Sequence, residues 1–151
     1  KTLCLIFLSK EHSTTFYFIE ASIKMGGKLS DFGRINEGFY DTSVEQTLNR
    51  EFCYWKEIRH RIFDIIKGKR LPLSCKIVLG LSKQSISYLI AHNNSSFREE
   101  DIEGIYINIL YDPKNLLITT GISYKNFSLD KSLEYAFDEY LAKFLKEKAV
   151  I

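Results

Sequence analysis

The stretch EGIYINILYDPKNLLITTGISYKNFSLDKSLEYAFDEYLAKFL, residues 103–145, decides the fold of this chain. It opens with Ile105–Tyr111, where β-branched and aromatic residues predominate, as in a packed, pleated strand. Asp112–Asn115 interrupts this run, because proline cannot donate to a sheet and Asp and Asn favour turns. Leu116–Tyr124 is typical of a returning strand. Two such runs joined by four residues predict an antiparallel hairpin.

A long amphipathic helix is predicted after the hairpin. Asp130 is the expected N-cap, with Ser128 as the alternative. Apolar residues then recur at spacings of three and four, which places them on one stripe of a helix: Leu133, Ala136, Phe137, Tyr140, Leu141, Phe144 and Leu145. A hairpin alone is marginally stable in water, so we expect this helix to cover one of its faces.

The N-terminal part of the chain predicts another hairpin. Thr15–Met25 and Lys28–Asn36 are expected to be strands on either side of a Gly26-Gly27 turn. Pairing around this turn would bring Glu20 and Arg34 together as a cross-strand ion pair. Strict alternation along the first strand would place Phe16, Phe18 and Glu20 on one face and Tyr17, Ile19, Ala21 and Ile23 on the other.

The middle of the chain supplies further helices and one more strand. Arg50–Lys67 has a helical period, Ser74–Leu81 is typical of a strand, and Ser82 would cap a helix over Lys83–His92. Ser43–Leu48 predicts a short helical turn. Together the elements predict an α+β fold. We expect a mainly antiparallel sheet of about five strands built from two hairpins, with helices packed largely on one face.

Length and composition bound the class of protein. A chain of 151 residues predicts a single domain over 1–151, and its net charge of +2 is not typical of nucleic-acid or membrane proteins. Cys4, Cys53 and Cys75 are odd in number and far apart, which favours a reducing, cytoplasmic location over a disulfide framework. The apolar run in Thr2–Leu8 is too short to span a membrane. It favours a buried helix or strand over a targeting segment.

Four stretches together resemble a known family. They are FIEASI at 18–23; GRIN at 33–36 with FY at 39–40; IKGKRLPLS at 66–74 with KIV at 76–78; and TTGIS at 119–123 with FSLDKSLE at 127–134. In this order they resemble an uncharacterised bacterial family catalogued as a domain of unknown function, number 5721. The family usually shows Ile-Asp before Gly-Arg, whereas Asp31-Phe32 stands here. The resemblance implies a cytoplasmic, single-domain protein with a helix ending near Leu3–Ser9. It implies no activity and assigns no functional residue.

A basic segment at residues 50–70 is the main charge feature. Seven basic residues face three acidic ones there, and Tyr54 and Trp55 are interleaved. Basic residues beside aromatic rings can hold phosphates and stack bases. A solvated helix face with a basic C-terminal end explains the same pattern, and we favour it. The candidate binding residues are Arg59, Lys67, Lys69 and Arg70 in this segment and Tyr106 on the central hairpin.

Other chemistries find little support in the sequence. His60 and Asp64 lie one turn apart on a predicted helix, with Glu57 one turn earlier, but no second cluster of metal ligands accompanies them. No phosphate-binding loop or nucleophile motif occurs. We therefore predict no metal, no cofactor and no catalytic residue. A deep pocket that gathers Glu20, Arg34 or His60 would favour an enzyme.

Three functional hypotheses remain, and we favour a non-catalytic binding or regulatory module. The alternatives are a nucleic-acid-binding protein that uses the basic helix and an enzyme with an unrecognised site. If the helices stack on one face of the sheet, Tyr106 and Leu110 stay exposed on the other, which predicts a homodimer or a protein partner at that face. The competing arrangement is a monomer whose second face is covered by the Arg50–Lys67 helix, with Trp55 inserted.

Overall fold

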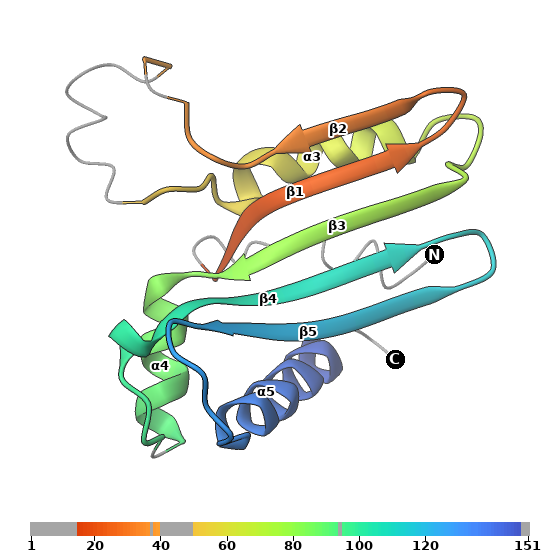
Figure 1. Cartoon of the computed structure of the whole chain (residues 1–151). Helices are drawn as coiled ribbons and strands as arrows, with labels where there is room; N and C mark the ends of the chain where they lie inside the picture. The colour runs from red at the N-terminus through yellow and green to blue at the C-terminus, as the bar shows by residue number, and fades with distance from the viewer. Residues whose placement is uncertain (1–14, 37, 40–49, 94, 149–151) are drawn as a thin grey trace.

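A five-stranded antiparallel sheet in the order β2-β1-β3-β4-β5 forms the centre of the fold (Figure 1). The computed structural model describes residues 15–36, 38–39, 50–93 and 95–148. The strands are β1 (Phe16–Lys24), β2 (Lys28–Phe32), β3 (Ser74–Leu81), β4 (Ile102–Tyr111) and β5 (Leu116–Tyr124). The described helices are α3 (Trp55–Ile66), α4 (Lys83–His92) and α5 (Ser132–Lys148), with a short 3-10 turn, η1, at Glu99–Asp101. The predicted α+β class and antiparallel sheet are confirmed.

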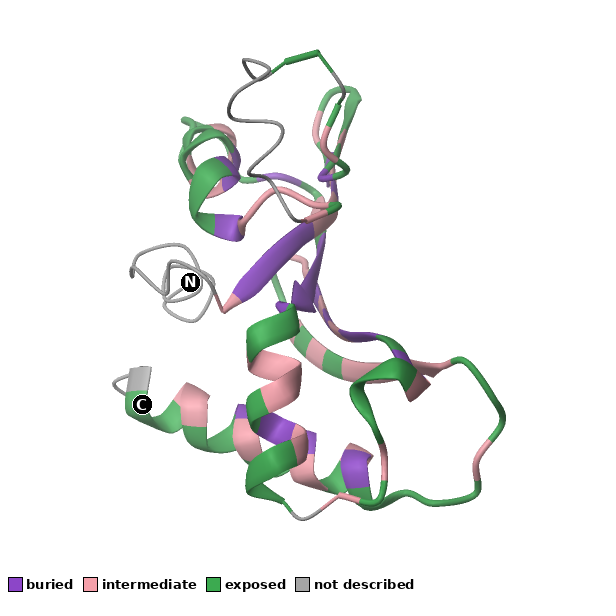
Figure 2. Cartoon of the chain, turned by 90° about the vertical axis from the view of Figure 1, so that its left-hand side faces the viewer, coloured by how far each residue is buried: buried purple, intermediate pink, exposed green. Residues whose placement is uncertain are grey.

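Helices α3 and α5 lie on the same side of the sheet, beneath opposite halves of it (Figures 1 and 2). Helix α4 lies at the end where β3 leaves the sheet (Figure 1). We call the other side of the sheet the open face, because no helix that the structure describes covers it. Trp55 packs against Phe18 in the core, with ring centroids 5.9 Å apart. The competing arrangement, in which Trp55 plugs the second face, is therefore wrong.

The core lies between the sheet and helices α3 and α5. From β4 it receives Ile105, Ile107 and Ile109, as the alternation in the hairpin predicts. The apolar stripe of α5 supplies Leu133, Phe137 and Leu141 to the same cluster. The Thr120 hydroxyl on β5 also donates to the Asp138 carboxylate at 2.6 Å. The last helix therefore covers the hairpin through both apolar and polar contacts.

A β-bulge between Phe18 and Glu20 reverses the alternation of β1. Phe16 and Phe18 are buried in the core before the bulge, and Ala21 and Ile23 are buried there after it. Glu20 lies opposite Val78 of β3 and belongs to the open face. The predicted grouping of Phe16, Phe18 and Glu20 is wrong, because an inserted residue shifts every later side chain to the other face.

The segment Arg50–Tyr54 takes the place of β2 beside the first half of β1. The Phe18 amide donates to the Cys53 carbonyl at 2.8 Å, and the Cys53 amide donates to the Gly33 carbonyl at 2.7 Å. These backbone bonds hold the segment extended, so α3 begins only at Trp55. The helix predicted from Arg50 is therefore too long at its N-terminal end.

The position of Arg50–Tyr54 beside β1 also separates Glu20 from Arg34. Glu20 pairs with Lys76 of β3 at 3.5 Å, and Arg34 pairs with Glu51 at 3.7 Å. The predicted Glu20–Arg34 ion pair is wrong, because Glu20 lies opposite Phe32 and the chain leaves β1 after Gly33, so that Arg34 pairs with the 50–54 segment instead.

The remaining elements agree closely with the sequence. β3 has the predicted bounds, and the Ser82 hydroxyl accepts the Ser85 amide at 3.4 Å as the cap of α4. The Asp130 carboxylate accepts the Ser132 amide at 2.9 Å where α5 begins. The elements predicted at 2–8 and 43–48 lie outside the described residues.

Candidate functional site

The open face carries an exposed apolar surface on β4 and β5. Leu110 of β4 is 42% exposed, and Leu117, its partner on β5, is 54% exposed. Tyr106 and Asn108 are half-buried on the same face of β4. Phe32, the last residue of β2, adds an exposed ring at the opposite edge of the sheet.

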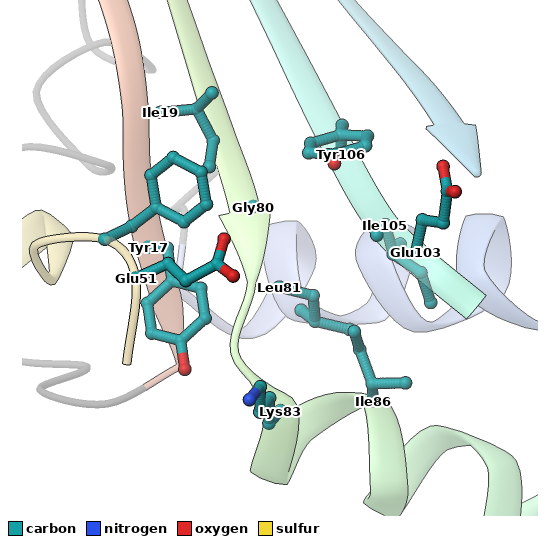
Figure 3. A pocket seen from close by; sticks show the side chains of 12 residues that line it. Tyr17, Ile19, Glu51, Gly80, Leu81, Lys83, Ile86, Glu103, Ile105 and Tyr106 are labelled. Carbon is teal, nitrogen blue, oxygen red and sulfur yellow. The ribbon is translucent and has the colours of Figure 1, made fainter. Parts of the chain in front are cut away.

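A hollow of about 140 Å³ lies over Gly80 at the α4 end of the open face (Figure 3). We call it the Gly80 hollow. Because Gly80 has no side chain, Ile19 packs close to the strand at the edge of this hollow; a Cβ at position 80 would lie 3.1 Å from the Cδ1 atom of Ile19. Three rings and three charged groups border it: Tyr17, Phe52, Tyr106, Glu51, Lys83 and Glu103.

The carboxylates at the hollow differ in orientation. Glu51 points towards Gly80, whereas the carboxylate of Glu103 turns towards β5 (Figure 3). There it accepts a hydrogen bond from the Ser123 hydroxyl at 2.8 Å. Lys83 supplies the cation of the lining from the first turn of α4. The charged lining therefore has one more carboxylate than ammonium group.

Tyr17 forms a buried wall of the hollow. Burial raises the pKa of its phenol, and this effect outweighs the hydrogen bond from the Lys83 backbone, which lowers the pKa. The phenol therefore stays neutral at physiological pH and keeps its proton. Its ring also contacts the rings of Phe52 and Tyr54, with centroids 6.3 and 5.5 Å away.

Arg50 fixes the segment that carries Glu51 and Phe52. Its two terminal nitrogens each donate to the Glu57 carboxylate at 2.8 Å, and one also donates to the Phe52 carbonyl at 3.1 Å. Burial raises the pKa of Glu57, but the hydrogen bonds from Arg50 and from the Tyr54 amide outweigh it, so the net pKa is lowered. This bidentate pair holds the segment against the start of α3.

Tyr106 forms the opposite wall because its ring lies back over Gly104. A Cβ atom on Gly104 would overlap the phenol of Tyr106. Any other residue at position 104 would therefore displace this ring. Aromatic faces and carboxylates both attract cations, so the hollow suits an ammonium or guanidinium group better than an anion.

A broader hollow of about 560 Å³ lies near the β4–β5 turn. Lys76, Leu110 and Leu117 project around it from the open face. The open face thus carries long side chains at its hairpin end and the Gly80 hollow at its α4 end.

Residues 6–151 match the model of a family described as being of unknown function, DUF5721. The chain belongs to this family. The resemblance that the four stretches indicate is therefore confirmed, and the description of the family assigns no activity. No curated protein and no solved structure gives a significant match. The described helices of this DUF5721 protein include none with both the length and the apolar composition that a membrane crossing requires.

The structure does not bring the sequence-predicted binding residues of the DUF5721 protein together. Tyr106 borders the Gly80 hollow on the open face. Lys67, Lys69 and Arg70 are exposed at and beyond the end of α3, on the other side of the sheet, and Lys67 pairs with Asp64 at 2.9 Å. Arg59 is half-buried within α3, and its Nε and Nη1 atoms have no hydrogen-bond partner among the described residues.

The described part of the DUF5721 protein does not gather Glu20, Arg34 or His60 in one pocket. Glu20 and Arg34 lie in separate surface ion pairs, and His60 is exposed on α3. None of the three borders the Gly80 hollow. Among the described residues, no three His, Cys, Asp or Glu side chains are grouped so that they could hold a metal ion.

Sequence reasoning missed Gly80, Tyr17, Glu51 and Phe52 as site residues. A glycine within a predicted strand, as at Gly80, is a known sign of a close approach or an opening, and it was the one available signal. The others depend on where residues 50–54 join the sheet. Local periodicity contains no information about that pairing.

Proposed function

We propose that this protein is a non-catalytic binding module that pairs with a second copy of itself through the open face. The exposure of Leu110 and Leu117 on a face that no described helix covers carries this proposal. Large apolar patches on soluble proteins usually mark interaction surfaces. The proposal includes a cytoplasmic location and a regulatory use of the pairing, in keeping with the scattered cysteines and the lack of a catalytic motif.

The size of the open face supports a stable dimer. Five strands spaced about 4.8 Å apart, with lengths near 30 Å for the nine-residue strands, give a face of about 700 Å². Stable interfaces bury about 800 Å² per partner. Two sheets packed face to face would therefore bury an area close to that of an ordinary dimer, at a separation of about 10 Å.

A second copy is favoured over an unrelated partner because one face carries both projecting side chains and a hollow that could receive them. Its hairpin end presents long side chains around a broad hollow, and its α4 end presents the smaller Gly80 hollow. An isologous interface needs a surface that is complementary to itself. Opposed ends of one face satisfy this requirement when two copies are related by a twofold axis.

Light scattering over a range of protein concentrations tests the proposal. We expect the mass to approach twice 17.6 kDa as concentration rises. Leu117→Glu should return the mass to that of a monomer, because it places a charge in the exposed apolar surface that Leu110 and Leu117 form. Leu129→Glu is the matched control, since Leu129 is equally apolar but lies exposed in the loop before α5. A wild-type mass near 17.6 kDa at every concentration would contradict the proposal.

A further inference from the structure

We infer that the twofold axis of this dimer runs across the strands, so that Lys76 of each copy enters the Gly80 hollow of the other. This inference rests on the proposed self-association and specifies its geometry. It follows from the register of the sheet, from the position of two glycines and from the charges around the Gly80 hollow.

Three rows of open-face residues define the geometry. The central row runs from β3 to β5 as Val78, Asn108 and Thr119, which lie side by side in register. Two residues towards the β4–β5 turn, the next row is Lys76, Leu110 and Leu117. Two residues in the other direction, the third row is Gly80, Tyr106 and Gly121.

The two outer rows are complementary in shape on β3 and β5, where a long side chain of one row corresponds to a glycine of the other, whereas on β4 Leu110 corresponds to Tyr106. One carries three long side chains, and the other carries two glycines on either side of Tyr106. At Gly121 no atom lies within 4 Å of the place that a Cβ would occupy, so the space above the strand is open. The Gly80 position is the floor of the hollow. A twofold axis along the central row exchanges the outer rows and places Leu117 over Gly121 and Lys76 over Gly80.

The alternative axis, parallel to the strands, gives a poor fit. It would place each row opposite the same row of the second copy. With that axis over β3, Lys76 would face a second Lys76; with the axis over β4, Lys76 would face Leu117, and Gly80 would face Gly121. In both cases no long side chain would enter the Gly80 hollow. Like charges in contact and unfilled space both weaken an interface. The row pattern therefore selects the axis that crosses the strands.

The chemistry of the Gly80 hollow suits the ammonium group of Lys76. Glu51 and Glu103 supply two carboxylates, and Tyr17, Phe52 and Tyr106 supply ring faces that attract cations. Lys83, from α4, faces the same space, and Arg34 pairs with Glu51 at 3.7 Å through two exposed side chains.

Within one copy, Lys76 forms a half-exposed ion pair with Glu20 at 3.5 Å. Such surface pairs contribute little to stability. Lys76 can therefore leave Glu20 and reach across the interface with little loss of free energy.

Zero-length cross-linking tests the position of Lys76 in the intact protein. A carbodiimide activates carboxylates, and a lysine amine in contact with one then forms an amide. We would mix unlabelled with ¹⁵N-labelled protein, treat the dimer and identify the linked peptides by mass spectrometry. We expect mixed-isotope products that join Lys76 to Glu51 or Glu103. The Lys76–Glu20 product within one copy serves as an internal control, since that pair is in contact in each chain. If a sample shown to be dimeric gives only that product, the inferred axis is wrong.

A leucine–glycine exchange tests the axis independently. Leu117→Gly removes the projecting side chain, and Gly121→Leu fills the space that receives it, so each alone should weaken dimerisation roughly tenfold or more. The double variant should recover most of the affinity, because an axis through Thr119 makes the two positions face each other. Circular dichroism melting would verify that each variant folds.

The exchange also separates this inference from the proposed function. A double variant weaker than both single variants, with the wild type still dimeric, would overturn the axis and leave the self-association intact. A monomeric wild type would overturn both.

Discussion

At Gly33, the backbone partner of β1 changes from β2 to the 50–54 segment. Its amide donates to the Ile19 carbonyl at 2.8 Å, and its carbonyl accepts the Cys53 amide at 2.7 Å. A Cβ at this position would overlap the backbone carbonyl of Phe18, and backbone atoms cannot move aside as a side chain can. We expect Gly33→Ala to lower the free energy of unfolding by about 1–3 kcal/mol through this overlap. Urea unfolding would measure the loss.

Gly27→Ala is the matched control for this substitution. Gly27 lies in the β1–β2 turn, where no atom lies within 4 Å of a Cβ and the backbone is not left-handed. We expect Gly27→Ala to leave the urea midpoint nearly unchanged. Equal midpoints for the two variants would show that the close approach at Gly33 is relaxed in solution.

The Arg50–Glu57 pair makes a second prediction at the residue scale. The pKa of Glu57 is lowered in the folded chain, so its contribution to stability is present above the unfolded pKa of about 4.3. That contribution is lost as the pH falls through the folded value. We expect Glu57→Gln to destabilise the protein near pH 7 and to approach the wild type in stability below about pH 4. Urea midpoints across this range test the expectation, with Glu139→Gln on the exposed side of α5 as the control.

At the scale of elements, strong periodicity predicted β3, β4, β5, α4 and α5 nearly to their observed bounds. Their patterns are local, because each apolar face follows from residues two, three or four positions apart. The sequence-based predictions are wrong where the alternation of a strand or the period of a helix is interrupted. The bulge between Phe18 and Glu20 inserts one residue into β1, and the extended backbone of Arg50–Tyr54 is set by bonds to Phe18 and Gly33. These bonds join residues far apart in sequence, so no local pattern could reveal them.

The apolar stripe of α5 gives a prediction at this scale. Phe137 is fully buried against the hairpin, whereas Tyr135 on the same helix is 69% exposed. We expect Phe137→Ala to cost about 3–5 kcal/mol in unfolding free energy, because it leaves a cavity in the core. Tyr135→Ala should change the urea midpoint far less. Comparable losses for the two variants would contradict the placement of α5.

At the scale of the whole molecule, the sequence indicated an uncovered sheet face but not the hollow within it. Tyr106 and Leu110 were expected on that face, because alternation in β4 separates them from the buried isoleucines. The Gly80 hollow depends on β1, β3, β4 and the 50–54 segment lying together. The basic residues 59–70 dominated the charge pattern of the sequence, yet they lie along and beyond α3, away from this hollow. The position of the candidate site therefore depends on contacts between segments that are far apart in sequence.

Self-association makes the stability of the whole molecule depend on its concentration. A dimer that forms only from folded chains shifts the unfolding equilibrium by mass action. Each tenfold rise in protein concentration should add about 1.4 kcal/mol per mole of dimer to the apparent unfolding free energy. We expect the urea midpoint of the wild type to rise between micromolar and hundred-micromolar protein. The midpoint of Leu117→Glu should stay constant, because a charge in the apolar surface of β4 and β5 prevents pairing. Leu129→Glu, outside that face, should keep the wild-type dependence. A wild-type midpoint that does not vary with concentration would show that the exposed leucines of β4 and β5 do not join two copies.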